Sequence, residues 1–233
     1  MHEHAARPLA TQSSARIALL PGAALRDDPM TLARAAALLG NTGKLEVACD
    51  DGSDIALALE VGAVAPAQRL EQFLVPLRPL KTIIVADGLL LRHLKRWLPK
   101  SKIIALGEAL TALDAVRRGL RATDMYVIEP RAYHSDFERL VKYYDRLRVE
   151  SGCTFNLDLQ RIAIAATARS LPQRLGLTTS EDGAEARWIL HGRTITRIVV
   201  ESLEDAVAFE SASDCPVVHV ADLADDGRRC SST

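Results

Sequence analysis

Aromatic residues and long apolar runs are scarce in this sequence of 233 residues. Only 4% of the residues are aromatic, whereas 48% are hydrophobic, so the core must be mainly aliphatic, as it is in many α/β proteins. No run approaches the roughly 18 apolar residues that a membrane-spanning helix needs. The N-terminus also lacks the apolar core of a signal peptide. We therefore expect a cytoplasmic protein that makes no membrane contact.

Paired cysteines and a basic excess are missing as well. Cys49, Cys153, Cys215 and Cys230 form no CxxC pair, so the sequence predicts scattered thiols rather than a structural zinc site. The formal net charge is −1, whereas a dedicated nucleic-acid-binding protein usually carries a clear excess of basic residues. Nucleic acid is therefore a partner that we do not favour.

The common catalytic signatures are also absent. The sequence contains no GxSxG, no GxxxxGK[ST] and no GxGxxG motif, so it gives no direct sign of a hydrolase nucleophile or of a nucleotide-binding loop. His93, His134, His191 and His219 stand apart from one another. Each is predicted to be a core or surface histidine rather than a catalytic base.

Short apolar runs alternate with helical patterns between residues 16 and 152. Runs rich in Ile, Val and Leu are typical of parallel strands that are buried on both faces. The expected strands are Arg16–Leu20, Leu45–Cys49, Lys81–Gly88, Lys102–Leu106 and Met125–Ile128. Five such strand–helix units predict an α/β fold with a doubly wound, flavodoxin-like parallel sheet.

Three regions are predicted along the chain. Residues 1–15 lack periodicity and should form a disordered tail, and residues 16–152 should form the main α/β domain. Residues 153–233 should form a smaller α/β module. In that module we expect a helix at Asp158–Ser170, a hinge at Leu171–Gly183 and a β-hairpin around His191 and Gly192.

The main domain resembles the receiver domain of response regulators. The segments DDPMTLARAAALLG and AVRRGLRATDMYVIEP carry the resemblance. It implies that Asp27 and Asp28 occupy the positions of the family's Mg²⁺ ligands, and that Asp87 occupies the position of its phosphoacceptor. The family's lysine and hydroxyl residue are replaced by Glu129 and Gly107. We therefore expect Asp87 to be a pseudo-phosphoacceptor that is not phosphorylated, because no cation offsets the added charge.

This resemblance favours a non-catalytic signalling or regulatory protein that acts through protein–protein contacts. Receivers commonly form dimers through the face that contains their last helix, which here corresponds to Ser135–Val149. Arg139, Tyr143 and Arg146 flank its apolar stripe, and an exposed Tyr between Arg residues is typical of interfaces. We predict a homodimer through this helix. No bound cofactor is expected, and Mg²⁺ on Asp27 and Asp28 is the one candidate.

Two other functions stay open. The first is a two-domain α/β enzyme that binds a small anionic substrate between its domains, in the manner of uroporphyrinogen-III synthase. The second is an accessory factor that binds nucleic acid through arginines. The residues predicted to bind anions in that case are Arg92, Arg96, Arg117, Arg118 and Arg121.

Overall fold

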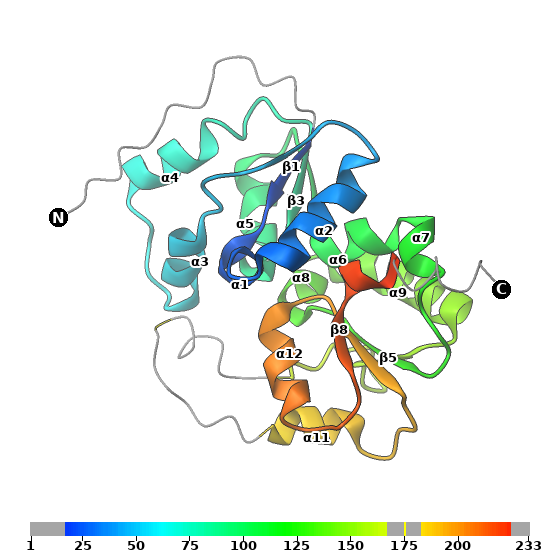
Figure 1. Cartoon of the computed structure of the whole chain (residues 1–233). Helices are drawn as coiled ribbons and strands as arrows, with labels where there is room; N and C mark the ends of the chain where they lie inside the picture. The colour runs from blue at the N-terminus through cyan, green and yellow to red at the C-terminus, as the bar shows by residue number, and fades with distance from the viewer. Residues whose placement is uncertain (1–16, 167–174, 176–182, 225–233) are drawn as a thin grey trace.

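The computed structural model describes residues 17–166, 175 and 183–224. The protein has an α/β fold with two parallel sheets of four strands each (Figure 1). This confirms the predicted α/β class with parallel strands. The tail predicted for residues 1–15 lies outside the described residues, as does almost all of the predicted hinge. No helix in the described ranges is long and apolar enough to cross a membrane.

The first sheet contains the first four strands in the order β2-β1-β3-β4, all parallel. Its strands are β1 (Ile17–Leu20), β2 (Leu45–Val47), β3 (Thr82–Val85) and β4 (Lys102–Ala105). The helices that connect and follow them are α1 (Gly22–Arg26), α2 (Pro29–Gly40), α3 (Ser53–Glu60), α4 (Ala67–Leu74), α5 (Gly88–Trp97), α6 (Leu106–Thr111) and α7 (Asp114–Arg117).

The second sheet repeats this topology with the order β6-β5-β7-β8. Its strands are β5 (Asp124–Val127), β6 (Thr154–Phe155), β7 (Arg197–Val200) and β8 (Val217–His219). Around it lie α8 (Pro130–Ser135), α9 (Phe137–Ser151), α11 (Ala184–Leu190), α12 (Leu203–Glu210) and the 3₁₀ helix η1 (Val220–Asp222). Strands β5 to β8 therefore occupy the same order as β1 to β4.

The single five-stranded sheet expected for residues 16–152 is not found. β5 pairs with β6 and β7, and it makes no pair with β4. The last strand–helix unit of the supposed receiver domain thus belongs to the second half of the molecule. The division between the two sheets falls between Ala105, the end of β4, and Asp124, the start of β5, whereas the predicted boundary is residue 152.

The two halves share one continuous apolar core. Leu19 and Ile84 from the first sheet lie in the same buried cluster as Tyr126 and Val199 from the second sheet. Helix α8 of the second half also packs on α5 of the first half, where Ala132 joins the core of the first half. The halves are consequently held together by hydrophobic packing as well as by polar contacts.

Two local predictions in the second half are wrong. The described part of the predicted helix at Asp158–Ser170 is irregular, with an antiparallel bridge between Leu157 and Ala163. The first arm of the predicted hairpin is helix α11, which begins after Gly183. Gly183 has a positive φ of 60°, a conformation that glycine adopts without steric cost.

Candidate active site between the two sheets

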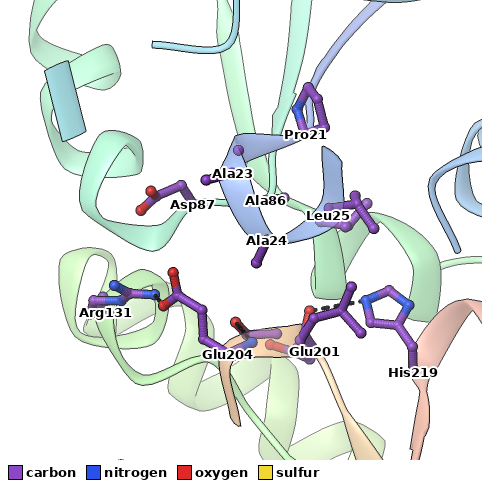
Figure 2. Close-up of a pocket in the computed structure, with 14 residues that line it drawn as sticks. Pro21, Ala23, Ala24, Leu25, Ala86, Asp87, Arg131, Glu201, Glu204 and His219 are labelled. Carbon is purple, nitrogen blue, oxygen red and sulfur yellow. Dashed lines mark hydrogen bonds and ion pairs between the residues drawn. The ribbon is translucent and has the colours of Figure 1, made fainter. Parts of the chain in front are cut away.

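The carboxyl ends of both sheets face one pocket. Its walls come from the segments that follow β1, β3, β4 and β7, from the end of β8 and from α8 (Figure 2). Open parallel sheets bind ligands at this edge. The space enclosed is about 20 Å³, which is roughly the room of one water molecule. The residues that line it include Gly22, Asp87, Arg131, Glu201, Ser202, Glu204 and His219.

Asp87 enters the pocket from the first half. It follows β3 and caps α5, where its carboxylate accepts a hydrogen bond from the Leu89 backbone N–H at 2.9 Å. Gly22 lies against it, since a Cβ added to this glycine would be 3.3 Å from the Cβ of Asp87. Ser202 holds the matching position in the second half, because it follows β7 by two residues and caps α12. The two halves therefore present helix-capping side chains to the same pocket.

Arg131 enters from α8 and is fixed by two carboxylates. Its Nε lies 2.5 Å from Glu129 Oε1, and its Nη2 lies 2.6 Å from Glu204 Oε2. Burial lowers the pKa of Arg131, but the two carboxylates raise it by more than burial lowers it, so the guanidinium stays charged. Its Nη1 is buried and has no hydrogen-bond partner in the described part of the chain.

Glu201 forms the floor of the pocket and is itself 4% exposed. Its Oε1 accepts hydrogen bonds from the Tyr126 and Tyr144 hydroxyls, each at 2.6 Å, and its Oε2 accepts one from the Glu129 backbone N–H at 2.9 Å. Burial raises the pKa of Glu201 to about 7. The three hydrogen bonds lower this pKa, yet they offset only part of the cost of burial.

Two glycines make room for carboxylates that reach from the second half into the first. A Cβ on Gly88, at the start of α5, would lie 1.9 Å from Glu129 Oε2. A Cβ on Gly107, in the first turn of α6, would lie 2.1 Å from Glu201 Cδ. Glu129 and Gly107 are the residues that replace the receiver family's lysine and hydroxyl. Here they belong to the contact between the halves.

His219 is a structural residue of the pocket wall. Its Nδ1 accepts a hydrogen bond from the Ala221 backbone N–H at 3.2 Å, so the tautomer is fixed with the proton on Nε2, which donates to the Glu201 carbonyl. Burial lowers the pKa of His219 to about 4. The ring is therefore neutral and fully hydrogen-bonded, which does not suit a catalytic base.

Asp27 and Asp28, the predicted Mg²⁺ ligands, do not line the pocket that contains Asp87. Helix α1 separates β1 from Asp27 and Asp28, so the pair does not end the strand. Asp27 is exposed at the end of α1, and Asp28 caps α2 through hydrogen bonds to Met30 and Thr31. No group of three or more metal-binding side chains gathers in the described residues.

The arginines predicted to bind anions do not line the pocket. Arg92 and Arg96 lie on the exposed face of α5. Arg117, Arg118 and Arg121 precede β5, at the opposite end of the second sheet from the pocket. Arg117 forms ion pairs with Asp114 and Glu150. The two groups of arginines therefore belong to separate surfaces.

The predicted dimer surface differs from the expectation at Tyr143. Arg139, Tyr143 and Arg146 do line a shallow groove on α9. The Tyr143 hydroxyl, however, points inward, 2.8 Å from Thr111 Oγ1 and 3.2 Å from the Glu108 carbonyl. Burial raises the pKa of Tyr143 to about 12. Arg139 is held by Glu108 and Asp136. Tyr143 is therefore not the exposed tyrosine that the prediction requires.

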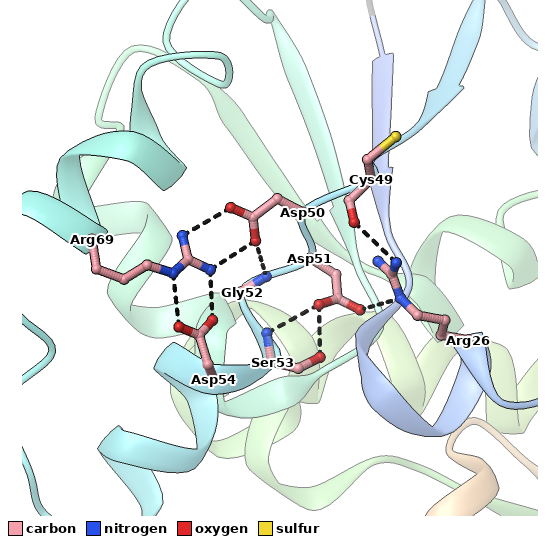
Figure 3. A network of polar contacts seen from close by, with 8 residues as sticks. All are labelled: Arg26, Cys49, Asp50, Asp51, Gly52, Ser53, Asp54 and Arg69. Atoms are coloured by element: carbon pink, nitrogen blue, oxygen red, sulfur yellow. Dashed lines mark hydrogen bonds and ion pairs between the residues drawn. The ribbon is translucent and has the colours of Figure 1, made fainter. Parts of the chain in front are cut away.

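A second acidic cluster is neutralised within the first half (Figure 3). Arg69 of α4 binds both Asp50 and Asp54, with nitrogen–oxygen distances of 2.6–2.9 Å. Arg26 binds Asp51 at 2.9 Å and also donates to the Cys49 carbonyl. These contacts tie α1 and α4 to the loop before α3 and to the first turn of α3. The cluster is therefore structural.

The sequence analysis did not predict Arg131, Glu201 and Glu204 of the pocket, nor the role of Glu129 and Asp205 beside them. Glu129 and Glu201 each come within two residues of the end of a buried strand, which is the available signal. Arg131, Glu204 and Asp205 lie in the first turns of the helices that follow. Their meeting depends on two sheets that face each other, and that arrangement is not visible in the spacing of the residues.

Comparison with known proteins gives a structural similarity but no family. No protein-family model matches this chain, and no curated protein is significantly similar to it. Among solved structures, the chain is similar to a protein from Yersinia pestis that is assigned as an Asp/Glu racemase. The two share 13% identity with a TM-score of 0.46, over 93% of this chain and 99% of the other. A similarity of this extent does not indicate which residues of this chain are functional or which molecule it binds.

The main interpretation from the sequence, a non-catalytic receiver-like regulator, is wrong. The chain lacks the receiver's single sheet, because β5 pairs with β6 and β7 in the second half. The acidic edge of the first sheet also faces a second sheet rather than solvent. Of the functions considered, the two-domain α/β enzyme agrees best with this architecture.

Proposed function

We propose that the protein is a two-domain α/β enzyme that binds a small polar molecule between its two sheets. The observation that carries the proposal is the convergence of two topologically equivalent carboxyl edges on one pocket. Each edge is the ordinary ligand-binding edge of a parallel sheet. Small-molecule sites are concave, lie preferentially between domains and contain a few convergent polar groups.

Asp87 and Glu204 are the proposed acid–base pair. They reach the pocket from opposite halves, with Asp87 following β3 and Glu204 in the first turn of α12 (Figure 2). A carboxylate on each side of a bound molecule allows one group to take a proton while the other returns one. Arg131, fixed between Glu129 and Glu204, would hold the molecule in place.

The charges of the pocket residues favour a substrate whose charge differs from the one expected from the sequence. The sequence-based alternative assumed a small anionic substrate. Arg131 is already balanced by Glu129 and Glu204, and Asp87 adds a further carboxylate. An anion placed here would meet more negative than positive charge among the described residues. This favours a neutral polar substrate over an anionic one.

A ligand screen followed by a turnover assay tests the proposal. Compounds that raise the melting temperature of the wild type are incubated with the protein, and products are detected by mass spectrometry. Turnover should fall at least 100-fold in Asp87→Asn and in Glu204→Gln, as expected when an acid–base group is removed. Asp27→Asn, an exposed carboxylate outside the pocket, is the matched control. Turnover that survives both pocket substitutions would overturn the proposal.

A further inference from the structure

Exposed cations without acidic neighbours extend from the outer side of α5 to the edge of the first sheet where β3 and β4 begin. We call this surface the basic face, and its members are Lys81, Arg92, Arg96, Lys100 and Lys102. The sequence has no acidic residue between Asp87 and Glu108. Within the described ranges, no ion pair joins a member of the basic face to a carboxylate. Its positive charge is therefore not neutralised by the protein itself.

The topology of the first sheet brings these cations together. Arg92 and Arg96 are four residues apart in α5, so they share one face of the helix. Helix α5 connects the parallel strands β3 and β4 and packs on both (Figure 1), so its C-terminal end returns to the edge where these strands begin. Lys100 lies in that return. Lys81 and Lys102 are adjacent there, since the Lys102 backbone N–H donates to the Lys81 carbonyl at 2.8 Å.

The fold does not account for this concentration of charge. A cation in the last turn of a helix is stabilised by the helix dipole, which explains Arg96 but not Arg92 in the middle of α5. Two like charges one turn apart repel each other. Lys95 of the same helix shows the contrast, because it forms an ion pair with Asp136. A binding role is the remaining reason for leaving the basic face unpaired.

Two aromatic rings lie beside these arginines. His93 and Trp97 are half-buried and one turn apart, with ring centroids separated by 5.3 Å. Burial lowers the pKa of His93, and the positive charges of Arg96 and Arg92 lower it further, so the ring is mainly neutral at pH 7. No large apolar side chain is exposed between residues 80 and 107, so this surface lacks the apolar groups that membrane-binding helices insert.

We propose that the basic face binds the sugar–phosphate backbone of a single-stranded nucleic acid. Surfaces that bind single strands combine cations along the backbone with aromatic rings on which bases stack. An acidic protein would match the cations but would make no such use of the rings. The net charge of −1 is compatible with this role, because a local cluster of charge is sufficient to attract a polyanion.

This site is separate from the pocket. The three lysines of the basic face lie at the opposite edge of the first sheet from Asp87, which follows the carboxyl end of β3. The proposal therefore does not depend on the proposed enzyme function, and either one can fail while the other stands.

The first experiment measures the fluorescence anisotropy of labelled oligo(dT) of about 15 nucleotides, titrated with the full-length protein. Arg92→Ala with Arg96→Ala should weaken binding at least tenfold. The matched control is Arg146→Ala with Arg187→Ala, which removes two exposed arginines of the second half and should change binding less than twofold. Both double variants should melt at the wild-type temperature, because the replaced side chains are exposed. If about four phosphates are contacted, the wild-type affinity should fall about 50-fold between 50 and 200 mM NaCl.

A second experiment reports on the basic face directly, because Trp97 and Trp188 are the two tryptophans of the chain. In Trp188→Phe, oligo(dT) should quench the remaining fluorescence of Trp97 in a saturable way, with the same Kd as the anisotropy. In Trp97→Phe, the fluorescence of Trp188 on α11 should not change.

Three results would overturn the proposal. The first is no binding of oligo(dT) at 50 mM NaCl, or binding that the Arg92 and Arg96 substitutions leave unchanged. The second is binding without quenching of Trp97. The third is equal or tighter binding of a polyglutamate peptide or of a DNA duplex of the same length, which would point to an acidic protein or to double-stranded DNA instead.

Discussion

Replacing Arg197 by Met should strongly destabilise the second half of the protein. Arg197, at the start of β7, forms a two-point contact with Asp124 at the start of β5, with nitrogen–oxygen distances of 3.0 and 2.6 Å. The side chains are 8% and 0% exposed, respectively. Arg197 also donates to the Gly119 carbonyl at 2.8 Å. Met fills a similar volume but leaves the Asp124 carboxylate buried without a cation.

The expected cost follows from this burial. Removing one partner of a buried ion pair typically lowers the free energy of unfolding by about 3–5 kcal/mol, because the remaining charge is uncompensated. For a chain of this length, each 1 kcal/mol corresponds to about 2–4 °C in Tm. The melting temperature should therefore fall by about 6–20 °C in Arg197→Met.

Urea unfolding monitored by circular dichroism measures the change. The double variant Arg197→Met with Asp124→Asn is the informative control, because Asn removes the charge and keeps an oxygen for the Arg121 backbone N–H, which now donates to Asp124 Oδ2 at 2.8 Å. The double variant should recover at least half of the lost stability. A single variant that loses less than about 1 kcal/mol, or a double variant no more stable than the single one, would refute the argument from the buried charge.

Three further predictions concern the contact between the halves and one helix cap. Gly88→Ala should lower the free energy of unfolding by about 1–3 kcal/mol, since the added Cβ would overlap a carboxylate oxygen of Glu129. Gly40→Ala, whose added Cβ meets nothing within 4 Å, should not destabilise the protein, and equal urea midpoints for the two variants would contradict this prediction. Stability should decrease as pH rises from about 5 to about 8, because burial raises the folded-state pKa of Glu201 to about 7. The folded protein therefore binds this proton more tightly than the unfolded chain, and the resulting stabilisation is lost as pH rises through the folded-state pKa. Glu201→Gln should reduce the pH dependence of stability, and an unchanged slope would contradict this. Asp28→Ala should cost about 1 kcal/mol through loss of the α2 cap, with Asp27→Ala as the neutral control in the same urea assay.

The parallel strands could be predicted from the sequence, but their division into sheets could not. Buried parallel strands are largely apolar along their length, and after its first residue β5 is as apolar as β3 and β4. Nothing in such a run indicates whether it pairs with the preceding strand or begins a new sheet. The resemblance to a receiver domain wrongly placed β5 in the same sheet as β3 and β4.

The errors in the second half have local causes. The segment RWILHGRTITRIVV contains β-branched residues on both sides of a Gly, which favours a hairpin reading. The chain instead forms α11 there, because Gly183 begins a helix whose Ala186 and Ile189 are buried. A single turn of apolar spacing is too short for the period alone to distinguish a helix from a strand.

Asp87 was the one pocket residue that sequence reasoning identified. It ends a buried strand and precedes a helix, and this position can be recognised in a single segment. Arg131 and Glu204 could not be found in the same way, because their contact joins two helices 73 residues apart. The hydroxyl of Tyr143 was predicted to be exposed because helical spacing alone does not place Thr111 beside it.

The most direct test of the enzyme assignment is the position of a bound ligand. The compound that stabilises the wild type most in the screen would be crystallised with the protein. The account predicts that it lies between Asp87, Arg131 and Glu204, three charged side chains that line the pocket. A ligand found in the α9 groove beside Arg139 and Arg146, with the pocket between the sheets empty, would contradict it.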